Sequence, residues 1–384
     1  MPEYPNTKEA LPGRIAVGLI VVTACLWTFW GTAEMYFEGW GQPFPAPLAY
    51  LIPAAISLLL ALAAIRFPRI GGWAMIALGG LFTVWWVRLQ LGRGADFAAL
   101  LTLFPVSAMI VVTGVLFLLD SRYQCRLRAE GAPTSPVWWR RNIRYVITVG
   151  AVLLTIIAIS VVNLPIVLTR DDDGYRGQRV IEGNGITIVW APSGPGWNWK
   201  QDFGGYPSWN SLALYGMEPV GIDWHGKQPG DSLDATPEQM HEFCVCAYLS
   251  EDGSTLVDTP LYIWRMPTTD EVVRSLCRDG RNAGCVWDGT DHSPECVVLA
   301  DKETPLWNPT EQPVYYWTAE QLNEKRAYFV SYNGRGVGAQ PKRWGNPRHG
   351  YRCVRNVKPG EVWDSLGILI DTTTIVADSG VTTP

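Results

Sequence analysis

The stretch from Tyr145 to Leu168 decides the fold of this chain, and it reads YVITVGAVLLTIIAISVVNLPIVL. It carries no charged side chain, and it is long enough to cross a hydrocarbon core, for which about 20 apolar residues are needed. The next stretch, Thr169 to Gly177, reads TRDDDGYRG and is strongly charged. We therefore expect a membrane-spanning helix that ends at Leu168, followed by a polar hinge into a soluble domain.

Four further apolar stretches precede this one, and none carries a charged side chain within its limits. They lie at about residues 15–31, 48–65, 70–87 and 97–119. The sequence therefore predicts a transmembrane domain of five helices over residues 1–168. The remaining residues, 169–384, are enough for one compact extracytoplasmic domain.

The composition excludes several classes of protein. The chain has 384 residues, of which 48% are hydrophobic, and a formal charge of -5. Its first 168 residues contain a single lysine, Lys8, whereas charges recur every few residues after Arg170. This contrast excludes a wholly cytosolic enzyme and a disordered chain. The apolar spans make membrane lipid an expected partner. No basic stripe lies on the soluble half, so we expect no nucleic acid as a partner.

Basic residues predict the orientation in the membrane. Ten lie on the side of the N-terminus: Lys8, Arg14, Arg66, Arg69, Arg122, Arg126, Arg128, Arg140, Arg141 and Arg144. Only Arg88 and Arg93 lie in the short loops of the opposite side. Because Lys and Arg concentrate on the cytoplasmic side, we expect a multi-pass protein of a prokaryotic plasma membrane with a cytoplasmic N-terminus and an extracytoplasmic C-terminal domain.

The soluble half has the pattern of an α+β domain with long loops. One helix is expected to begin after Thr236 and to run to Leu249, and another to begin at Thr268 or Thr269. Short β-type runs are separated by Gly, Pro and Asn clusters. These predicted strands are Ile186 to Trp190, Leu261 to Trp264, Val314 to Trp317 and Tyr328 to Tyr332.

Six cysteines lie in the soluble half: Cys244, Cys246, Cys277, Cys285, Cys296 and Cys353. An even number in an extracytoplasmic domain favours disulfides over a zinc site, since there is no CxxC pair. The best local candidate joins Cys277 to Cys285, because the Asp, Gly and Asn residues between them favour a turn. Cys244 and Cys246 are expected to bond to other partners, while Cys25 and Cys125 remain thiols.

Two motifs in this half resemble a known family. The first is WRMPT, which contains Trp264, Arg265, Pro267 and Thr268. The second begins at YYWT, which contains Trp317, and ends at GYRCVR, which contains Arg352, Cys353 and Arg355. In this order they resemble the bacterial DUF1566 domain, also called the Lcl C-terminal domain, over about residues 236–355.

The resemblance implies a fold similar to that of the formylglycine-generating enzymes, a variant of the C-type lectin architecture. Those enzymes use a pair of cysteines shortly before the final motif to bind copper. This sequence has no cysteine between Trp317 and Gly350, so only the terminal, structural cysteine has a match, at Cys353. The alternative for the motifs is structural: the tryptophans fill the core, and Arg265, Arg352 and Arg355 bond to buried carbonyls or carboxylates.

A segment rich in aromatic residues, Pro192 to Tyr215, is the candidate binding surface. Exposed rings beside polar groups suit stacking on a glycan or a protein partner. The candidates are Trp197, Trp199, Lys200, Asp202, Trp209 and Asn210. The alternative is that these tryptophans fill the core or lie on the membrane surface.

No cofactor is expected, although calcium is an alternative at Asp288, Asp291 and Glu295, which lack the twelve-residue EF-hand pattern. The four histidines are scattered without the spacing of metal ligands, and no nucleophile motif occurs. We therefore expect a membrane-anchored binding or interaction protein, within or outside a membrane complex. The alternatives are an unconventional enzyme related to the formylglycine-generating group, and a sensory or transport role for the helical bundle.

Overall fold

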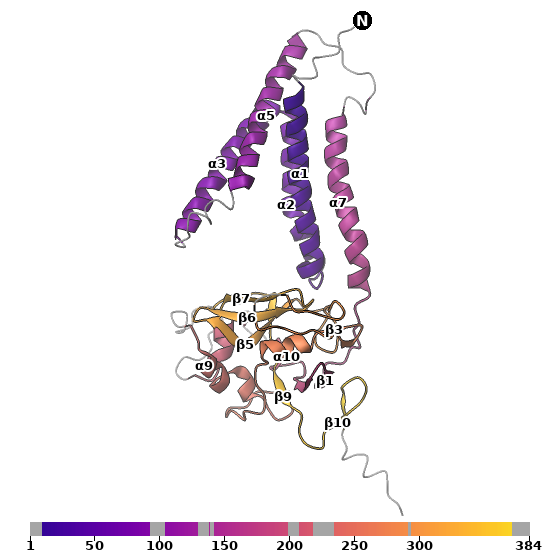
Figure 1. Ribbon diagram of the computed structural model, residues 1–384, viewed down its shortest axis with the longest axis vertical. Coiled ribbons are helices and arrows are strands. Elements are labelled where there is room, and N and C mark those ends of the chain that lie inside the picture. The colour runs from indigo at the N-terminus through magenta and orange to yellow at the C-terminus, as the bar shows by residue number, and fades with distance from the viewer. Residues whose placement is uncertain are drawn as a thin grey trace, which may run out of the picture. The chain divides into compact units, whose positions relative to one another are not determined.

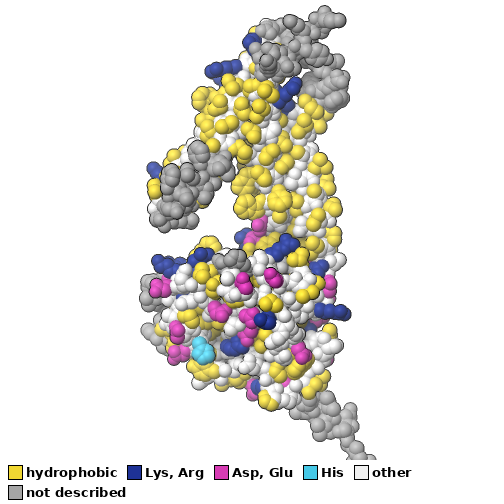
Figure 2. Space-filling model, viewed as in Figure 1, with side chains coloured by type: hydrophobic (Ala, Val, Ile, Leu, Met, Phe, Trp, Pro, Cys, Tyr) yellow, Lys and Arg dark blue, Asp and Glu magenta, His cyan; other side chains and the backbone are white. Residues whose placement is uncertain are grey.

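A computed structural model describes residues 10–92, 104–129, 138, 142–198, 207–217, 234–290 and 293–370 (Figure 1). The chain divides into two compact units, Met1–Val167 and Leu168–Pro384. The first unit is helical, and hydrophobic side chains cover its surface (Figure 2). The second unit is an α/β structure that carries many charged side chains on its surface (Figure 2).

The first unit has five long helices in the part of the chain that the structure describes. They are α1 (Leu11–Glu34), α2 (Ile52–Arg66), α3 (Pro68–Gly92), α5 (Phe104–Ala129) and α7 (Ile143–Leu168). A π-helical turn, η1 (Met35–Gly39), extends α1, and a 3-10 turn, η2 (Ala46–Leu51), precedes α2. Five helical segments are long and apolar enough to cross a membrane; the second of them, Ala46–Arg66, joins η2 to α2, since α2 alone has 15 residues.

Glycines allow the helices of this unit to pack closely. A Cβ atom at Gly72 of α3 would lie 2.8 Å from the carbonyl oxygen of Gly114, and one at Gly114 of α5 would lie 2.6 Å from the carbonyl oxygen of Gly72. Apolar helices are held together largely by such close packing of small residues, because lipid is as apolar as the helices themselves.

The fourth apolar helix differs from the predicted range 97–119. Residues 97–103 lie outside the described residues, and α5 continues past Leu119 through Asp120 and Arg122 to Ala129. The carboxylate of Asp120 is buried and accepts two hydrogen bonds from Arg144 of α7, at 2.6 and 3.1 Å. The predicted limits 97–119 contain no charged side chain, but the observed span, 107–127, extends past them and contains a carboxylate neutralised by an arginine 24 residues away.

The second unit contains two small sheets. One is antiparallel with the order β1-β2-β9, formed by Arg179–Gly183, Ile186–Trp190 and Val354–Asn356. The other has the order β7-β6-β5-β8, formed by Val337–Pro341, Arg326–Ser331, Tyr315–Asn323 and His349–Gly350, with β5 and β8 parallel. Two hairpins complete the strands: β3 (Cys277–Arg278) with β4 (Arg281–Asn282), and β10 (Val362–Trp363) with β11 (Leu369–Ile370).

Short helices accompany the sheets. They are α8 (Trp209–Ala213), α9 (Pro237–Glu242), the 3-10 turn η4 (Val245–Tyr248) and α10 (Thr269–Arg274). Thr236 and Thr268 cap α9 and α10 in capping boxes, as their sequences predicted. The predicted helix from Thr236 to Leu249 is wrong in length, because α9 ends at Glu242 and the chain turns before η4.

Three of the four strands predicted from the sequence are present in the structure. β2 has the predicted bounds, and β5 and β6 overlap the runs at 314–317 and 328–332. The run from Leu261 to Trp264 is not a strand, since Tyr262 has a φ of +54° and only Arg265 forms an isolated bridge, to Val354. Leu261 and Tyr262 are exposed in this irregular segment, while Ile263 packs against the core and Trp264 lies in it.

Two disulfides cross-link the second unit, Cys246 to Cys353 and Cys285 to Cys296. The predicted pairing of Cys277 with Cys285 is wrong. Cys277 lies on β3 opposite Asn282, and its thiol is free and buried. Cys244 is also a free buried thiol, so two of the six candidate cysteines form no disulfide.

Candidate functional site

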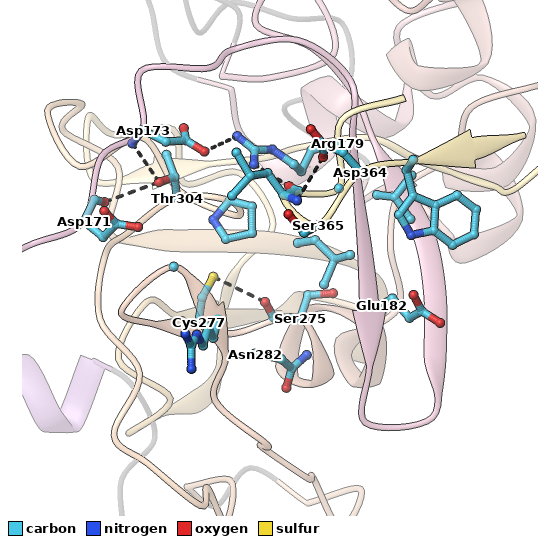
Figure 3. Close-up of a pocket in the computed structure, with 18 of the residues that line it drawn as sticks. Asp171, Asp173, Arg179, Glu182, Ser275, Cys277, Asn282, Thr304, Asp364 and Ser365 are labelled. Atoms are coloured by element: carbon cyan, nitrogen blue, oxygen red, sulfur yellow. Dashed lines mark hydrogen bonds and ion pairs between the residues drawn. The ribbon is translucent and has the colours of Figure 1, made fainter. Parts of the chain in front are cut away.

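The second unit holds a cavity of about 720 Å³, drawn in Figure 3. Segments that are distant in the sequence line it: residues 171–173, 179–182, 275–282, 304–305 and 363–367. Small-molecule sites typically have volumes of about 300 to 1,000 Å³. The cavity is therefore large enough for a small organic ligand.

Carboxylates dominate the charged lining of the cavity. They belong to Asp171, Asp173, Glu182, Asp279 and Asp364, and all five residues are exposed. The cationic residues of the lining are Arg179 and Arg281. Arg179 is buried, and its guanidinium is held 2.6 Å from the carboxylate of Asp173 and 2.5 Å from the carbonyl oxygen of Leu366. Asp279 is also paired, with Arg278 at 3.5 Å, so the carboxylates of Asp171, Glu182 and Asp364 remain against Arg281, and the cavity has a net negative charge.

A tight turn brings Asp171 to the cavity. The β3–β4 hairpin turns at Asp279 and Gly280, whose φ angles are +52° and +69°. A Cβ atom at Gly280 would lie 2.4 Å from the Oδ2 atom of Asp171, so alanine at this position would require the carboxylate to move. Thr304 also holds the segment that contains Asp171, because its N–H donates to the carbonyl oxygen of Asp171 at 3.2 Å.

The loop after β10 closes one side of the cavity. Gly367 has a φ of +78°, and a Cβ atom there would lie 2.0 Å from the carbonyl oxygen of Val180. The N–H of Val180 donates to the carbonyl oxygen of Gly367 at 2.8 Å. The loop therefore packs directly on β1, and Ser365 and Leu366 form an exposed part of the cavity wall.

Ser275 contributes a polar group to the lining that has no partner. It follows α10, it is fully buried, and its Oγ atom makes no hydrogen bond in the structure. A buried hydroxyl without a partner costs free energy, about 1 to 3 kcal/mol. Figure 3 shows Ser275 between Cys277 and Glu182 among the residues that line the cavity.

Cys277 also lines the cavity, but its thiol is not reactive. Its Sγ atom lies 3.5 Å from the carbonyl oxygen of Ser275, and burial raises the pKa of the thiol to about 12. Burial likewise raises the pKa of Cys244 to about 12. Both cysteines are therefore protonated near neutral pH, and neither is poised as a nucleophile.

Charged side chains close to Thr304 in the sequence form a largely buried cluster of ion pairs. Arg278 lies 3.2 Å from the carboxylate of Asp301 and 3.3 Å from that of Glu303, while Arg170 lies 3.1 Å from Asp301. Burial raises the pKa of Glu303, which the Arg278 charge opposes. Lys302 is fully buried and donates to the carbonyl oxygen of Glu311, and burial, followed by the Arg170 charge, lowers its pKa to about 7.

The first motif residues lie in the core and at a helix start. Trp264 is buried, and its Nε1 donates to the carbonyl oxygen of Ser250 at 3.1 Å. Arg265 donates two hydrogen bonds to Glu271, at 2.7 and 2.5 Å, and Thr268 caps α10 with the same Glu271 as the reciprocal partner. These contacts fix the entry of the helix and point no group into the cavity.

The second motif residues are also structural. Trp317 is buried and donates to the carbonyl oxygen of Pro207 at 3.3 Å, and Arg355 donates to Glu361 at 2.9 and 2.7 Å. The guanidinium of Arg352 is buried over the ring of Trp197, with 3.6 Å from its Cζ atom to the ring centroid. It donates to three carbonyl oxygens, those of Ala191, Pro305 and Leu306.

The aromatic segment is divided by the structure. Trp197 and Trp209 are buried, and they donate to the hydroxyl of Tyr316 and to the carbonyl oxygen of Thr318, both at 2.8 Å. Asn210 is buried too, and its Oδ1 accepts from the N–H of Ala235. These three residues belong to the core, so the exposed binding surface expected there is wrong for them. Trp199, Lys200 and Asp202 lie outside the described residues.

The calcium alternative is only partly covered, since Asp291 lies outside the described residues. Asp288 accepts hydrogen bonds from the N–H and hydroxyl of Thr290, as in an Asx turn. Among the described side chains, no group of three or more His, Cys, Asp or Glu is arranged to hold a metal ion.

Sequence reasoning missed the cavity. The one local signal is the run Asp171 to Asp173, which by itself predicts only a polar hinge. Its partners, the hairpin at Gly280 and the loop at Gly367, lie over 100 residues further along the chain. Comparison with known protein families, with curated proteins and with solved structures finds no match to this chain.

Proposed function

We propose that the chain is a membrane-anchored binding protein whose second unit captures a small organic cation outside the cell. The single observation that carries this proposal is the cavity of about 720 Å³ with its excess of carboxylates. Opposite charges attract strongly in a partly enclosed site, where the dielectric constant is lower than in water.

The chemistry of the lining favours a ligand with more than one amino group. Asp171 approaches the hairpin turn at Gly280, while Glu182 lies on β1, so carboxylates approach the cavity from different segments. The unpartnered hydroxyl of Ser275 adds a neutral acceptor at the buried end. An ammonium group donates three hydrogen bonds and suits such a set of acceptors.

The anchoring part of the proposal rests on the apolar helices and on charge. Four arginines lie at the ends of helices that the chain order brings to one side: Arg66, Arg69, Arg122 and Arg126. This distribution supports a cytoplasmic N-terminus and an extracytoplasmic second unit. The disulfides support the same side, because they persist in oxidising compartments.

We further propose a distant relationship of the second unit to the DUF1566 domain and a C-type-lectin-like fold. The order of the motif residues and their burial support this, since each has a structural partner. Because these motif residues are buried, the alternative of an unconventional enzyme is less well supported than a binding protein. The buried thiols of Cys244 and Cys277 do not provide the exposed cysteine pair that the formylglycine-generating chemistry needs.

Calorimetric titration with spermidine tests the proposed ligand class. The full chain, reconstituted in zwitterionic nanodiscs, should bind spermidine at one site, and binding should weaken as salt is raised. The double variant Asp171→Asn with Glu182→Gln should lose most of this affinity. The matched control is Glu238→Gln, an exposed carboxylate on α9 outside the cavity. Equal binding by both variants, or no binding by the native chain, would refute the proposal.

A further inference from the structure

We infer that the loop Val297–Leu299 is a membrane-docking element that inserts apolar side chains into the interfacial region of the bilayer. This inference rests on the membrane anchoring proposed above and is independent of the cation site. Its three side chains, Val297, Val298 and Leu299, are consecutive, apolar and 85%, 46% and 61% exposed. Such a run on a water-facing surface is unfavourable and typically marks a docking surface.

The loop is held rigidly in its exposed position. The Cys285–Cys296 disulfide ends directly before it, and the N–H of Val298 donates to the carbonyl oxygen of Ala283 at 3.2 Å. After it, the N–H of Asp301 donates to the carbonyl oxygen of Cys277 at 2.9 Å. The backbone is therefore fixed at both ends, while the three side chains point away from the core.

The course of the chain indicates that the bilayer covers these side chains. Leu168 ends the apolar helix α7, and Arg170, two residues later, pairs with the buried carboxylate of Asp301 at 3.1 Å. Asp301 is itself two residues after Leu299. Two residues extend the chain by at most about 7 Å, so Leu168 and Leu299 each lie within about that distance of a member of this ion pair, and the loop lies near the segment that follows α7.

The polar surroundings indicate which property of the bilayer is recognised. Three carboxylates, those of Asp171, Asp172 and Asp173, directly follow Arg170 after the helix, so acidic side chains outnumber basic ones in this segment. Anionic headgroups are therefore not the attractive feature, and insertion of the apolar side chains supplies the interaction. The loop would limit rotation of the second unit about its hinge.

Depth-dependent fluorescence quenching tests this inference on the full chain. In a Cys25→Ser, Cys125→Ser background, an environment-sensitive dye is attached at Leu299→Cys, and the protein is reconstituted in phosphatidylcholine vesicles with lipids spin-labelled at the headgroup level. The control site is Val362→Cys, an exposed residue of β10. The insertion reference is Ile157→Cys, an exposed residue of α7, with quenchers placed on the acyl chain.

We expect the dye at position 299 to show blue-shifted emission and strong quenching by the headgroup-level label. Raising the salt to about 0.5 M, which screens most interactions between surface charges, should not reverse this quenching. The dye at position 362 should stay unquenched. If position 299 is as unquenched as position 362 while position 157 is quenched, the docking inference is wrong. If position 157 also escapes quenching, the anchoring proposal and the docking inference both fall, whereas cation binding is unaffected by either result.

Discussion

The Nη2 atom of Arg170 lies 3.1 Å from the Oδ1 atom of Asp301, and both side chains are almost fully buried. Arg170 follows the end of α7 by two residues, so this ion pair fixes the first residues of the second unit against its interior. Asp301 also receives Arg278 at 3.2 Å. The segment that carries Thr304 to the cavity is therefore held by charges that cannot be removed singly without leaving another one buried.

Replacing Asp301 with Asn should lower the free energy of unfolding of the second unit by about 3 to 5 kcal/mol, because the buried guanidinium of Arg170 loses its carboxylate, while the partly exposed Arg278 keeps Glu303. The measurement is urea unfolding of the full chain in detergent, followed by tryptophan fluorescence. The control is Asp172→Asn, which removes a half-exposed partner of Arg176 and should cost less than about 1 kcal/mol. Similar losses for both variants would show that the buried pair has no special role.

Lys302 should make the second unit more stable as pH rises from about 7 to about 9. Its folded pKa of about 7 lies below the value of about 10.4 for a free lysine. Above pH 7 the folded state has released a proton that the unfolded chain still holds, so the free energy of unfolding rises, by at most about 1.4 kcal/mol per pH unit. Above pH 9 the buried thiols act in the opposite direction, because their folded pKa is raised.

The test is the pH dependence of urea unfolding in the native chain and in Lys302→Met. Methionine fills a similar volume and does not titrate, so the variant should show a flatter dependence over the same window. Parallel curves for the two proteins would mean that Lys302 keeps its proton in the folded state.

Gly280→Ala should disturb both stability and the cavity. The new methyl group meets the carboxylate of Asp171 at 2.4 Å, in addition to the cost of a positive φ for alanine. Gly289→Ala is the matched control, since Gly289 has a φ of +91° with nothing within 4 Å of an added Cβ atom. We expect Gly289→Ala to cost about 1 kcal/mol and Gly280→Ala clearly more, with weaker spermidine binding only in the latter. Equal effects would deny the close approach of Asp171.

Gly13→Ala should destabilise the helical unit. An added Cβ atom at Gly13 of α1 would lie 1.9 Å from the Oδ1 atom of Asp120, whose carboxylate pairs with Arg144. Gly18→Ala is the control on the same helix, because nothing lies within 4 Å of a Cβ atom there. In thermal unfolding in detergent, Gly13→Ala should lose about 1 to 3 kcal/mol, while Gly18→Ala should be neutral or slightly stabilising. Loss of stability in neither variant would place Asp120 away from α1.

Removing the two disulfides should have unequal effects. The Cys246–Cys353 bond closes a loop of 107 residues and the Cys285–Cys296 bond one of 11. On the chain-entropy estimate, the long loop contributes about 4.7 kcal/mol and the short one about 3 kcal/mol. Double serine variants test this order, and mass spectrometry of the unreduced protein should find these two linked pairs. A peptide linking Cys277 to Cys285 would contradict the structure.

The local parts of the fold could be predicted from the sequence. Apolar stretches of sufficient length gave the helices, and the cap residues Thr236 and Thr268 marked two short helices because capping is a contact over three residues. The extension of α5 through Asp120 could not be predicted, since its neutralising partner, Arg144, lies on another helix.

The cavity itself could not be predicted from the sequence. The cavity depends on Asp171, Gly280 and Gly367 meeting in space, and on Ser275 being buried without a partner. The cysteine pairing failed for the same reason, because a favourable turn between Cys277 and Cys285 says nothing of Cys296 approaching from beyond the hairpin. The sequence left open whether the tryptophans at 197 and 209 are exposed or fill the core, because the acceptors that hold them in the core, Tyr316 and Thr318, come from β5.

The most direct test of the central claim is the labelling rate of Ser365→Cys on intact cells with a membrane-impermeant maleimide, with and without spermidine. Ser365 is an exposed residue of the cavity wall, and Cys125 is an exposed native thiol near the end of α5. We predict that position 365 is labelled, that Cys125 is labelled only after the membrane is permeabilised, and that spermidine slows labelling at 365. Labelling of Cys125 but not of position 365 on intact cells, or a rate at 365 that spermidine does not change, would contradict the account.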